Sequence, residues 1–206
     1  MMSTPNEEAA GTELAKSNFG DAKIAPEHRE TEGPFDLSEV PAIRPYVDLG
    51  SIKVLPREGL QLRLDVEEGS QRLVALSLDY LESTLQVQAF SAPKSAGVWG
   101  SILNQTRTQL AAQGATAELV QGHFGPELLA ELPAADSGAP QMMRFIGVDG
   151  PRWVLRGIVT GVANSDAKVS ASLDELFKSL VVVRGDMPMP PRELLPLRVP
   201  ANARAE

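Results

Sequence analysis

The sequence contains no cysteine, which excludes disulfide bonds, cysteine nucleophiles, iron–sulfur clusters and cysteine-type zinc sites. It has only two histidines, His28 and His123, too few for a histidine-rich metal site. Aromatic residues make up only 5% of the chain, so the core must consist mainly of leucine, valine and alanine. We therefore expect neither a metal nor a cofactor.

Long apolar runs and an excess of basic residues are also missing. No run approaches the roughly 20 residues that span a bilayer, and the first residues lack the basic and apolar regions of a secretory signal. The formal net charge is −8, which argues against nucleic-acid binding and against adhesion to anionic membranes. We expect a cytoplasmic protein that binds neither nucleic acid nor membrane.

The chain divides into three parts by composition. Residues 1–33 hold seven acidic and three basic residues and few large apolar ones, which predicts a disordered acidic tail. Residues 34–185 carry the strand and helix patterns of one domain. Residues 186–206 are rich in proline, which predicts an extended C-terminal segment, either docked on the domain or free.

Strand patterns outnumber helical ones within the domain. Alternating leucines over 60–66 predict a half-buried strand, and residues 141–148 and 152–162 form the clearest hairpin. Helical spacing recurs over about 97–113, and a second apolar stripe runs from Val169 to Leu180. We expect an α+β fold, with two main helices packed on one face of an antiparallel sheet. This order of elements resembles Mog1/PsbP-like sandwiches, a likeness of fold only.

The templates of known catalysis are not met. The sequence has no G-x-S-x-G nucleophile elbow and neither a Walker nor a Rossmann glycine loop. His123 could serve as a general base, but a loop histidine is more often inert. We assign no catalytic residue and lean against an enzyme.

The hairpin carries the best group of candidate binding residues. Alternation places Arg152 and Arg156 on one face, with Arg144 on the neighbouring strand and Asp149 at the turn. Trp99, at the start of the first helix, could line a pocket or staple the helix to the sheet. The arginines could hold an anion, but salt bridges to neighbouring strands are the simpler interpretation.

Several longer stretches resemble a known family. They are Gly33-Pro34-Phe35-Asp36, Val47-Asp48-Leu49-Gly50, Phe124-Gly125-Pro126-Glu127-Leu128, Arg144-Phe145 with Gly147-Val148-Asp149-Gly150-Pro151-Arg152-Trp153, Val181-Val182-Val183-Arg184-Gly185 and Met187-Pro188-Met189-Pro190-Pro191-Arg192. Nearly everything after Gly33 is similar to an uncharacterised actinobacterial family, domain of unknown function 3710. The resemblance implies no activity.

Two functional hypotheses follow. The first is a non-enzymatic protein-binding or scaffold module that meets a protein partner around Asp149, Arg152 and Arg156. The alternative is an enzyme or small-molecule binder that holds an anionic ligand, such as a nucleotide, through Arg144, Arg152 and Arg156. The sequence leaves the oligomeric state open.

Overall fold

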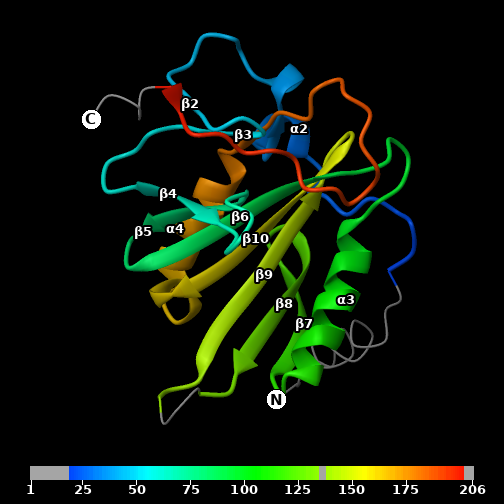
Figure 1. Cartoon of the computed structure of the whole chain (residues 1–206). Coiled ribbons are helices and arrows are strands. Elements are labelled where there is room, and N and C mark those ends of the chain that lie inside the picture. Colours follow the sequence, from blue (N-terminus) through cyan, green and yellow to red (C-terminus); the bar gives the residue numbers. More distant parts are fainter. Residues whose placement is uncertain (1–18, 135–137, 202–206) are drawn as a thin grey trace, which may run out of the picture.

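The computed structural model describes residues 19–134 and 138–201. Its main element is a seven-stranded sheet, antiparallel throughout, in the order β4-β5-β6-β10-β9-β8-β7 (Figure 1). The strands are β4 (Gln61–Val66), β5 (Leu73–Tyr80), β6 (Ser83–Ser91), β7 (Thr116–Gly122), β8 (Gly125–Leu132), β9 (Gln141–Asp149) and β10 (Trp153–Gly161). The expected α+β class is confirmed, and the predicted hairpin is β9 and β10.

A smaller four-stranded sheet packs on one face of the large one, in the order β1-β11-β3-β2. Ile52 and Val182 of the small sheet belong to the same buried cluster as Leu76 and Leu85 of the large sheet. The remaining elements are β1 (Phe35–Asp36), β2 (Val47–Asp48), β3 (Ile52–Val54), β11 (Val181–Val182), α2 (Arg29–Glu32), α3 (Trp99–Ala112), α4 (Ala167–Lys178) and the 3₁₀ turns η1 (Leu37–Glu39) and η2 (Val162–Asn164).

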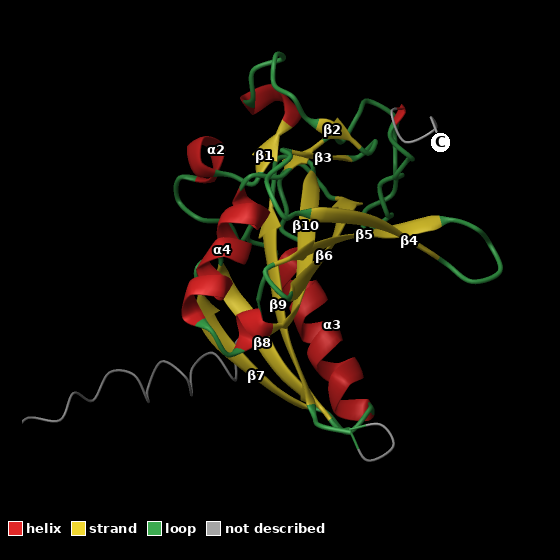
Figure 2. Ribbon diagram, turned by 90° about the vertical axis from the view of Figure 1, so that its left-hand side faces the viewer, coloured by secondary structure: helices red, strands yellow, loops and turns green. Residues whose placement is uncertain are grey.

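The long helices α3 and α4 cover opposite faces of the large sheet (Figure 2). A Cβ atom added to Gly147 would lie 2.4 Å from the Trp99 ring of α3, and one added to Gly157 would lie 3.0 Å from the Phe177 ring of α4. Gly157 pairs with Ile146, so the two glycines point to opposite faces. The expectation of both helices on one face is wrong, because the end of β9 is buried on both faces and needs cover on each.

The two helices begin differently. Asp166 precedes α4, and its carboxylate accepts hydrogen bonds from the amides of Lys168 (2.8 Å) and Val169 (3.1 Å), as an N-cap does. Val98 precedes α3 and has no side chain that can cap it. The first amides of α3 therefore need an acceptor from elsewhere in the fold. Within the described residues, no helix has the length and apolarity needed to cross a membrane.

Residues 19–33 form a strap along the domain. The Gly97 amide donates to the Asp21 carbonyl at 2.7 Å, and Phe19 and Ile24 pack against the α3 core. The predicted disordered tail covers residues 1–33; residues 1–18 of it lie outside the described residues. For residues 19–33 the prediction of disorder is wrong. A few specific contacts order this segment, although its composition is polar.

The proline-rich C-terminal segment docks on the domain. Leu195 is 1% exposed, and its amide donates to the Ala89 carbonyl of β6 at 2.9 Å. The Ser91 amide donates to the Glu193 carbonyl at 2.8 Å, and Leu197 forms an isolated bridge with Gly50. The segment bends at 186–187 and turns at 191–192, and its contacts reach both β6 of the large sheet and the Gly50 region beside β3.

Candidate functional site

The turn between β9 and β10 is held by the buried carboxylate of Asp149, which is 2% exposed. This carboxylate accepts hydrogen bonds from the amides of Val98 (2.8 Å) and Trp99 (3.1 Å), and from that of Ile24 in the strap (2.9 Å). Asp149 thus supplies the acceptor that α3 lacks at its own N-terminus. The predicted binding residue is a structural anchor.

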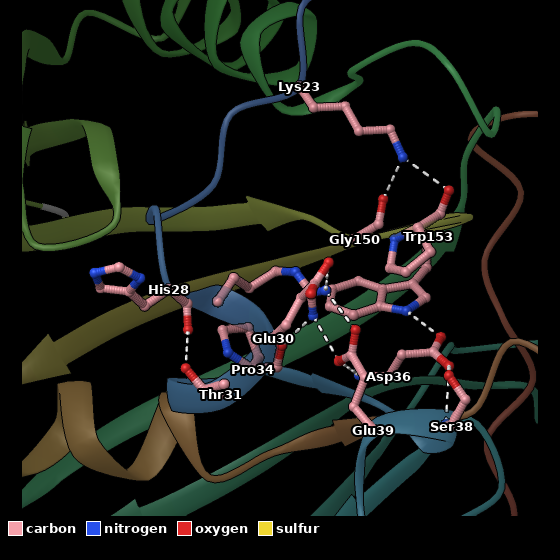
Figure 3. Close-up of polar contacts among 12 residues, drawn as sticks. Lys23, His28, Glu30, Thr31, Pro34, Asp36, Ser38, Glu39, Gly150 and Trp153 are labelled. Atoms are coloured by element: carbon pink, nitrogen blue, oxygen red, sulfur yellow. Dashed lines mark hydrogen bonds and ion pairs between the residues drawn. The ribbon is translucent and has the colours of Figure 1, made fainter.

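Lys23 of the strap closes over the same turn. Its Nζ donates to the carbonyls of Gly150 (2.5 Å) and Pro151 (2.7 Å), as Figure 3 shows for Gly150. Burial lowers the pKa of the Lys23 ammonium, and the nearby carboxylate of Asp149 opposes that shift. The turn is therefore fixed from both sides, by a carboxylate beneath it and an ammonium above it.

Trp153, the first residue of β10, joins the turn to the small sheet. Its indole N–H donates to Asp36 at 2.9 Å (Figure 3), and the Arg29 guanidinium lies 5.7 Å from its ring centroid. Arg29 also makes two hydrogen bonds to Glu39, at 2.8 and 2.6 Å. Burial alone would raise the pKa of Asp36, but hydrogen bonds from Ser38 and Trp153 and the charge of Arg29 hold it below its ordinary value.

Of the two roles that its position allows, Trp99 packs the helix onto the sheet and does not line a pocket. Its side chain is buried, and its indole N–H donates to the Pro126 carbonyl of β8 at 3.1 Å. Gly147 of β9 leaves room for its ring, since any side chain there would overlap it. Trp99 therefore packs α3 onto the sheet and presents no surface to a ligand.

Arg144 and Arg156 lie on opposite faces of the sheet. The Arg144 guanidinium is hydrogen-bonded to Asp174 of α4 and lies 3.6 Å from the Glu127 carboxylate. Arg156 donates to the Gln88 side chain on the face that α4 leaves uncovered, and burial lowers the pKa of its guanidinium. A salt bridge to a neighbouring strand, the simpler interpretation, describes Arg144 with Glu127, whereas Arg156 makes a hydrogen bond to a neutral side chain.

Arg152 differs from the other predicted site residues. Its side chain is exposed at the turn and has no polar partner among the described residues. It borders a hollow of about 440 Å³ that Arg184, Asp36 and Asp186 also line. The Nε atom of Arg184 is buried without a partner in the described part of the chain, while its Nη1 donates to the Met187 carbonyl at 2.9 Å. We call this the Arg152 hollow.

A second hollow, of about 330 Å³, lies on the strap side of the same turn. Lys23, Arg29, Glu30 and Asp149 are among the residues that line it. Sequence reasoning missed its strap residues, because they belong to a segment that composition assigns to the tail. The Gly150-Pro151 corner therefore separates two hollows, each with charged residues among those that line it.

The sequence analysis did not single out Glu127, a buried carboxylate on β8. It is 2% exposed, and its Oε1 atom has no hydrogen-bond partner among the described residues. Burial raises the pKa of its carboxyl, and the charge of Arg144 only partly opposes this. The sequence signal for this carboxylate was weak, because the same strand also carries Glu131, which is exposed. Searched over residues 19–134 and 138–201, the chain shows no cluster of three or more His, Cys, Asp or Glu fit for a metal ion.

Comparison with known proteins identifies a family but no activity. The model of the family described as "Protein of unknown function (DUF3710)" matches residues 33–206. The chain belongs to this family, which confirms the resemblance read from its sequence. Neither a curated protein nor a solved structure matches the chain. The likeness to Mog1/PsbP-like sandwiches therefore stays a prediction.

Proposed function

We propose that this member of the DUF3710 family is a non-enzymatic protein-binding or scaffold module of an actinobacterial cytoplasm. Its contact surface is the β9–β10 turn with the Arg152 hollow. The observation that carries this proposal is the contrast between Arg152 and the other candidate residues. Arg144, Asp149, Arg156 and Trp99 are engaged inside the domain, whereas Arg152 is exposed and unpartnered among the described residues.

The rigidity of the turn supports this role. Asp149 holds it from below and Lys23 from above, so Arg152 is presented from a fixed backbone. A preorganised surface loses less conformational entropy on binding than a mobile loop does. Arginine is also enriched among the residues that dominate the energetics of protein interfaces.

The charges of the hollow favour a polar peptide segment over a simple anion. Arg152 and Arg184 supply positive charge, while Asp36 and Asp186 supply negative charge at the same opening. A phosphate-like ligand would meet both acids, whereas a peptide offers donors and acceptors together. We infer a partner that offers a carboxylate or carbonyl to Arg152 and an N–H group to the acids.

The alternative, an enzyme or binder of an anionic small molecule, needs Arg144, Arg152 and Arg156 to converge. Arg144 faces α4, and Arg156 lies on the other face of the sheet. The three arginines therefore share no site, and the alternative in that form loses its geometric basis. A thermal-shift screen of nucleotides and phosphorylated metabolites tests what remains of it, an anion held by Arg152 and Arg184.

Affinity purification of the full chain from its native host tests the proposal. Arg152→Glu reverses the charge at the rim of the hollow without removing an internal contact, so the melting temperature should stay within a few degrees. We expect at least about a tenfold loss of the co-purifying partner, the scale of a hot-spot residue. An unchanged set and amount of partners would refute the proposed surface.

The matched control is Lys168→Glu, an exposed charge reversal in the first turn of α4. The length of β10 separates it from the turn by about 30 Å. This control should retain the partner. Arg156→Ala is a poor probe, because it breaks a contact inside the domain and lowers stability as well.

A further inference from the structure

Strand β4 forms one edge of the large sheet, and its charged residues, Arg63 and Asp65, are of opposite sign. Figure 2 shows the β4–β5 hairpin extending away from the helices. Natural edge strands usually carry a proline, a lysine or a bulge that blocks pairing with another chain. Gln61–Val66 holds no proline and no lysine. Its one irregularity places the extra residue on β5, since Asp65 pairs with Ala75 and Val66 with Leu73.

The outward backbone groups of β4 can be identified. The Glu67 amide donates to the Arg72 carbonyl at 2.8 Å, so Glu67 turns its backbone groups toward β5. Alternation along a regular strand then directs the N–H and C=O groups of Leu62, Leu64 and Val66 away from β5. Among the described residues no partner for these three amides is found. They form a row of free donors and acceptors.

The side chains of β4 are arranged symmetrically about Leu64. Leu62 and Val66 share a face of the strand with Leu64, and Arg63 and Asp65 lie on the opposite face, one on each side of Leu64. Leu62 is 36% exposed and Val66 is 47% exposed, although both are large apolar residues. The Arg63 side chain is 60% exposed and lies 3.6 Å from Asp65 of its own chain.

We propose that β4 pairs antiparallel with β4 of a second copy of this chain, on a two-fold axis through Leu64. Arg63 of each copy then lies opposite Asp65 of the other, and Leu62 lies opposite Val66. The Arg63–Asp65 pairs fall at positions without backbone hydrogen bonds, where side chains approach most closely. One contact thus satisfies the free backbone groups, pairs opposite charges and covers both exposed apolar residues.

Neighbouring registers are disfavoured by the same residues. A two-fold axis through Arg63 or through Asp65 places like charges opposite each other, which is destabilising. A slip of one residue sets Leu62 opposite Asp65, so apolar and charged side chains meet on the wrong faces. The pattern therefore selects the register centred on Leu64.

The opposite edge of the sheet offers no such match. Strand β7 carries a single charged residue, Glu118, so no register of β7 with itself forms an ion pair. A two-fold axis through Glu118 would bring two carboxylates together. The inference is thus specific to β4, and it is independent of the β9–β10 turn.

Sedimentation velocity of the full chain over a concentration series tests the pairing. The wild-type chain should form a dimer by about 100 µM, a concentration that populates a moderate contact. Arg63→Glu places a glutamate opposite Asp65 in two symmetric positions and should weaken the dimer at least tenfold. Lys168→Glu, the charge-matched control on α4, should leave it intact. A wild-type monomer at that concentration, or an Arg63→Glu dimer of unchanged strength, would overturn the proposal.

A cysteine cross-link checks the register without relying on affinity. Because the chain has no cysteine, Leu64→Cys introduces a single thiol on the two-fold axis. Residues opposite each other in a hydrogen-bonded pair lie about 5.5 Å apart at Cα, within the range that a disulfide spans. Leu64→Cys should form a covalent dimer several times faster than Leu81→Cys, a control at the exposed tip of the β5–β6 hairpin. Equal rates would refute the register.

Discussion

Ile24 and Asp149 hydrogen-bond each other twice. The Ile24 amide donates to the Asp149 carboxylate at 2.9 Å, and the Asp149 amide donates to the Ile24 carbonyl at 2.8 Å. The two residues are 125 positions apart in the chain. This reciprocal contact makes the strap part of the domain and fixes the end of β9 at the point where the turn toward Arg152 begins.

Asp149→Ala should destabilise the domain strongly. The substitution leaves the buried amides of Val98, Trp99 and Ile24 without their acceptor, and unpaired buried donors are costly. We expect a loss of about 3 kcal/mol in the free energy of unfolding, measured by urea denaturation. Asp149→Asn retains one acceptor oxygen and should lose less. A loss below about 1 kcal/mol for alanine would contradict the anchoring role.

Glu127 should make stability depend on pH in the sense opposite to most carboxylates. Burial raises the folded-state pKa of its carboxyl above the ordinary 4.5, and Arg144 does not fully offset this. Its favourable contribution is therefore complete below pH 4.5 and is lost as pH rises through the folded-state pKa. Glu127→Gln imitates the protonated form at every pH. Its unfolding free energy, relative to wild type, should rise between about pH 4.5 and 7.

The measurement for Glu127 is urea unfolding of both proteins at several pH values. Glu131→Gln makes the same chemical change at an exposed position of the same strand and serves as the control. The difference in unfolding free energy between Glu127→Gln and wild type could instead stay constant across this range or fall with rising pH. Either result would show that the buried carboxylate does not cause the pH dependence.

Gly147→Ala should disturb the packing of α3. The added methyl group would lie 2.4 Å from the Trp99 ring, and the hydrogen bond from the indole N–H to the Pro126 carbonyl holds that ring in place. Overpacking of this kind costs about 1–3 kcal/mol, and we expect the upper part of that range by thermal or urea denaturation. Gly20→Ala meets no atom within 4 Å and should change stability by less than about 0.5 kcal/mol. Equal effects would argue against the close contact.

Leu195→Ala should reveal how much the C-terminal segment contributes to the core. Leu195 is 1% exposed, so truncation leaves a cavity between the sheets and should cost about 2–5 kcal/mol. Val199→Ala, in the same segment at 45% exposure, should cost less than about 0.5 kcal/mol. Comparable stabilities of the two variants would mean that the segment does not dock in solution.

The β9–β10 hairpin was predictable because its information is local. Short runs of apolar and β-branched residues on both sides of Asp149-Gly150-Pro151 specify two strands and a turn, and the structure places them within a residue or two of the prediction. Helix α3 was predictable for the same reason, from its apolar spacing. The prediction that α4 lies on the same face was wrong, because the side of a sheet on which a helix packs depends on the connection and not on the helix's own pattern.

The candidate site was harder to predict, since a charged residue looks the same in a sequence whether it binds a partner or its own fold. Arg144 and Arg156 lie on neighbouring strands, yet the register sends them to opposite faces, where each finds an internal partner. The strap was missed because the prediction of a disordered tail used the average composition of residues 1–33, which hides a few ordering contacts. Two or three anchors, such as Ile24 and Lys23, are enough to order it.

The sequence by itself determined the α+β class, the hairpin, the family, and the absence of cysteine chemistry. The class, the hairpin and the cysteine argument follow from composition and from periodicities within about ten residues, and the family follows from the resemblance of specific sequence stretches. Only the tertiary structure decided that Asp149 caps a helix, that Lys23 closes over the turn while Arg29 pairs with Glu39, and that Arg152 alone of the predicted arginines stays exposed. Those outcomes depend on contacts between residues far apart in the chain. A side chain's role is set by the neighbour that the fold brings to it, and local pattern does not encode that neighbour.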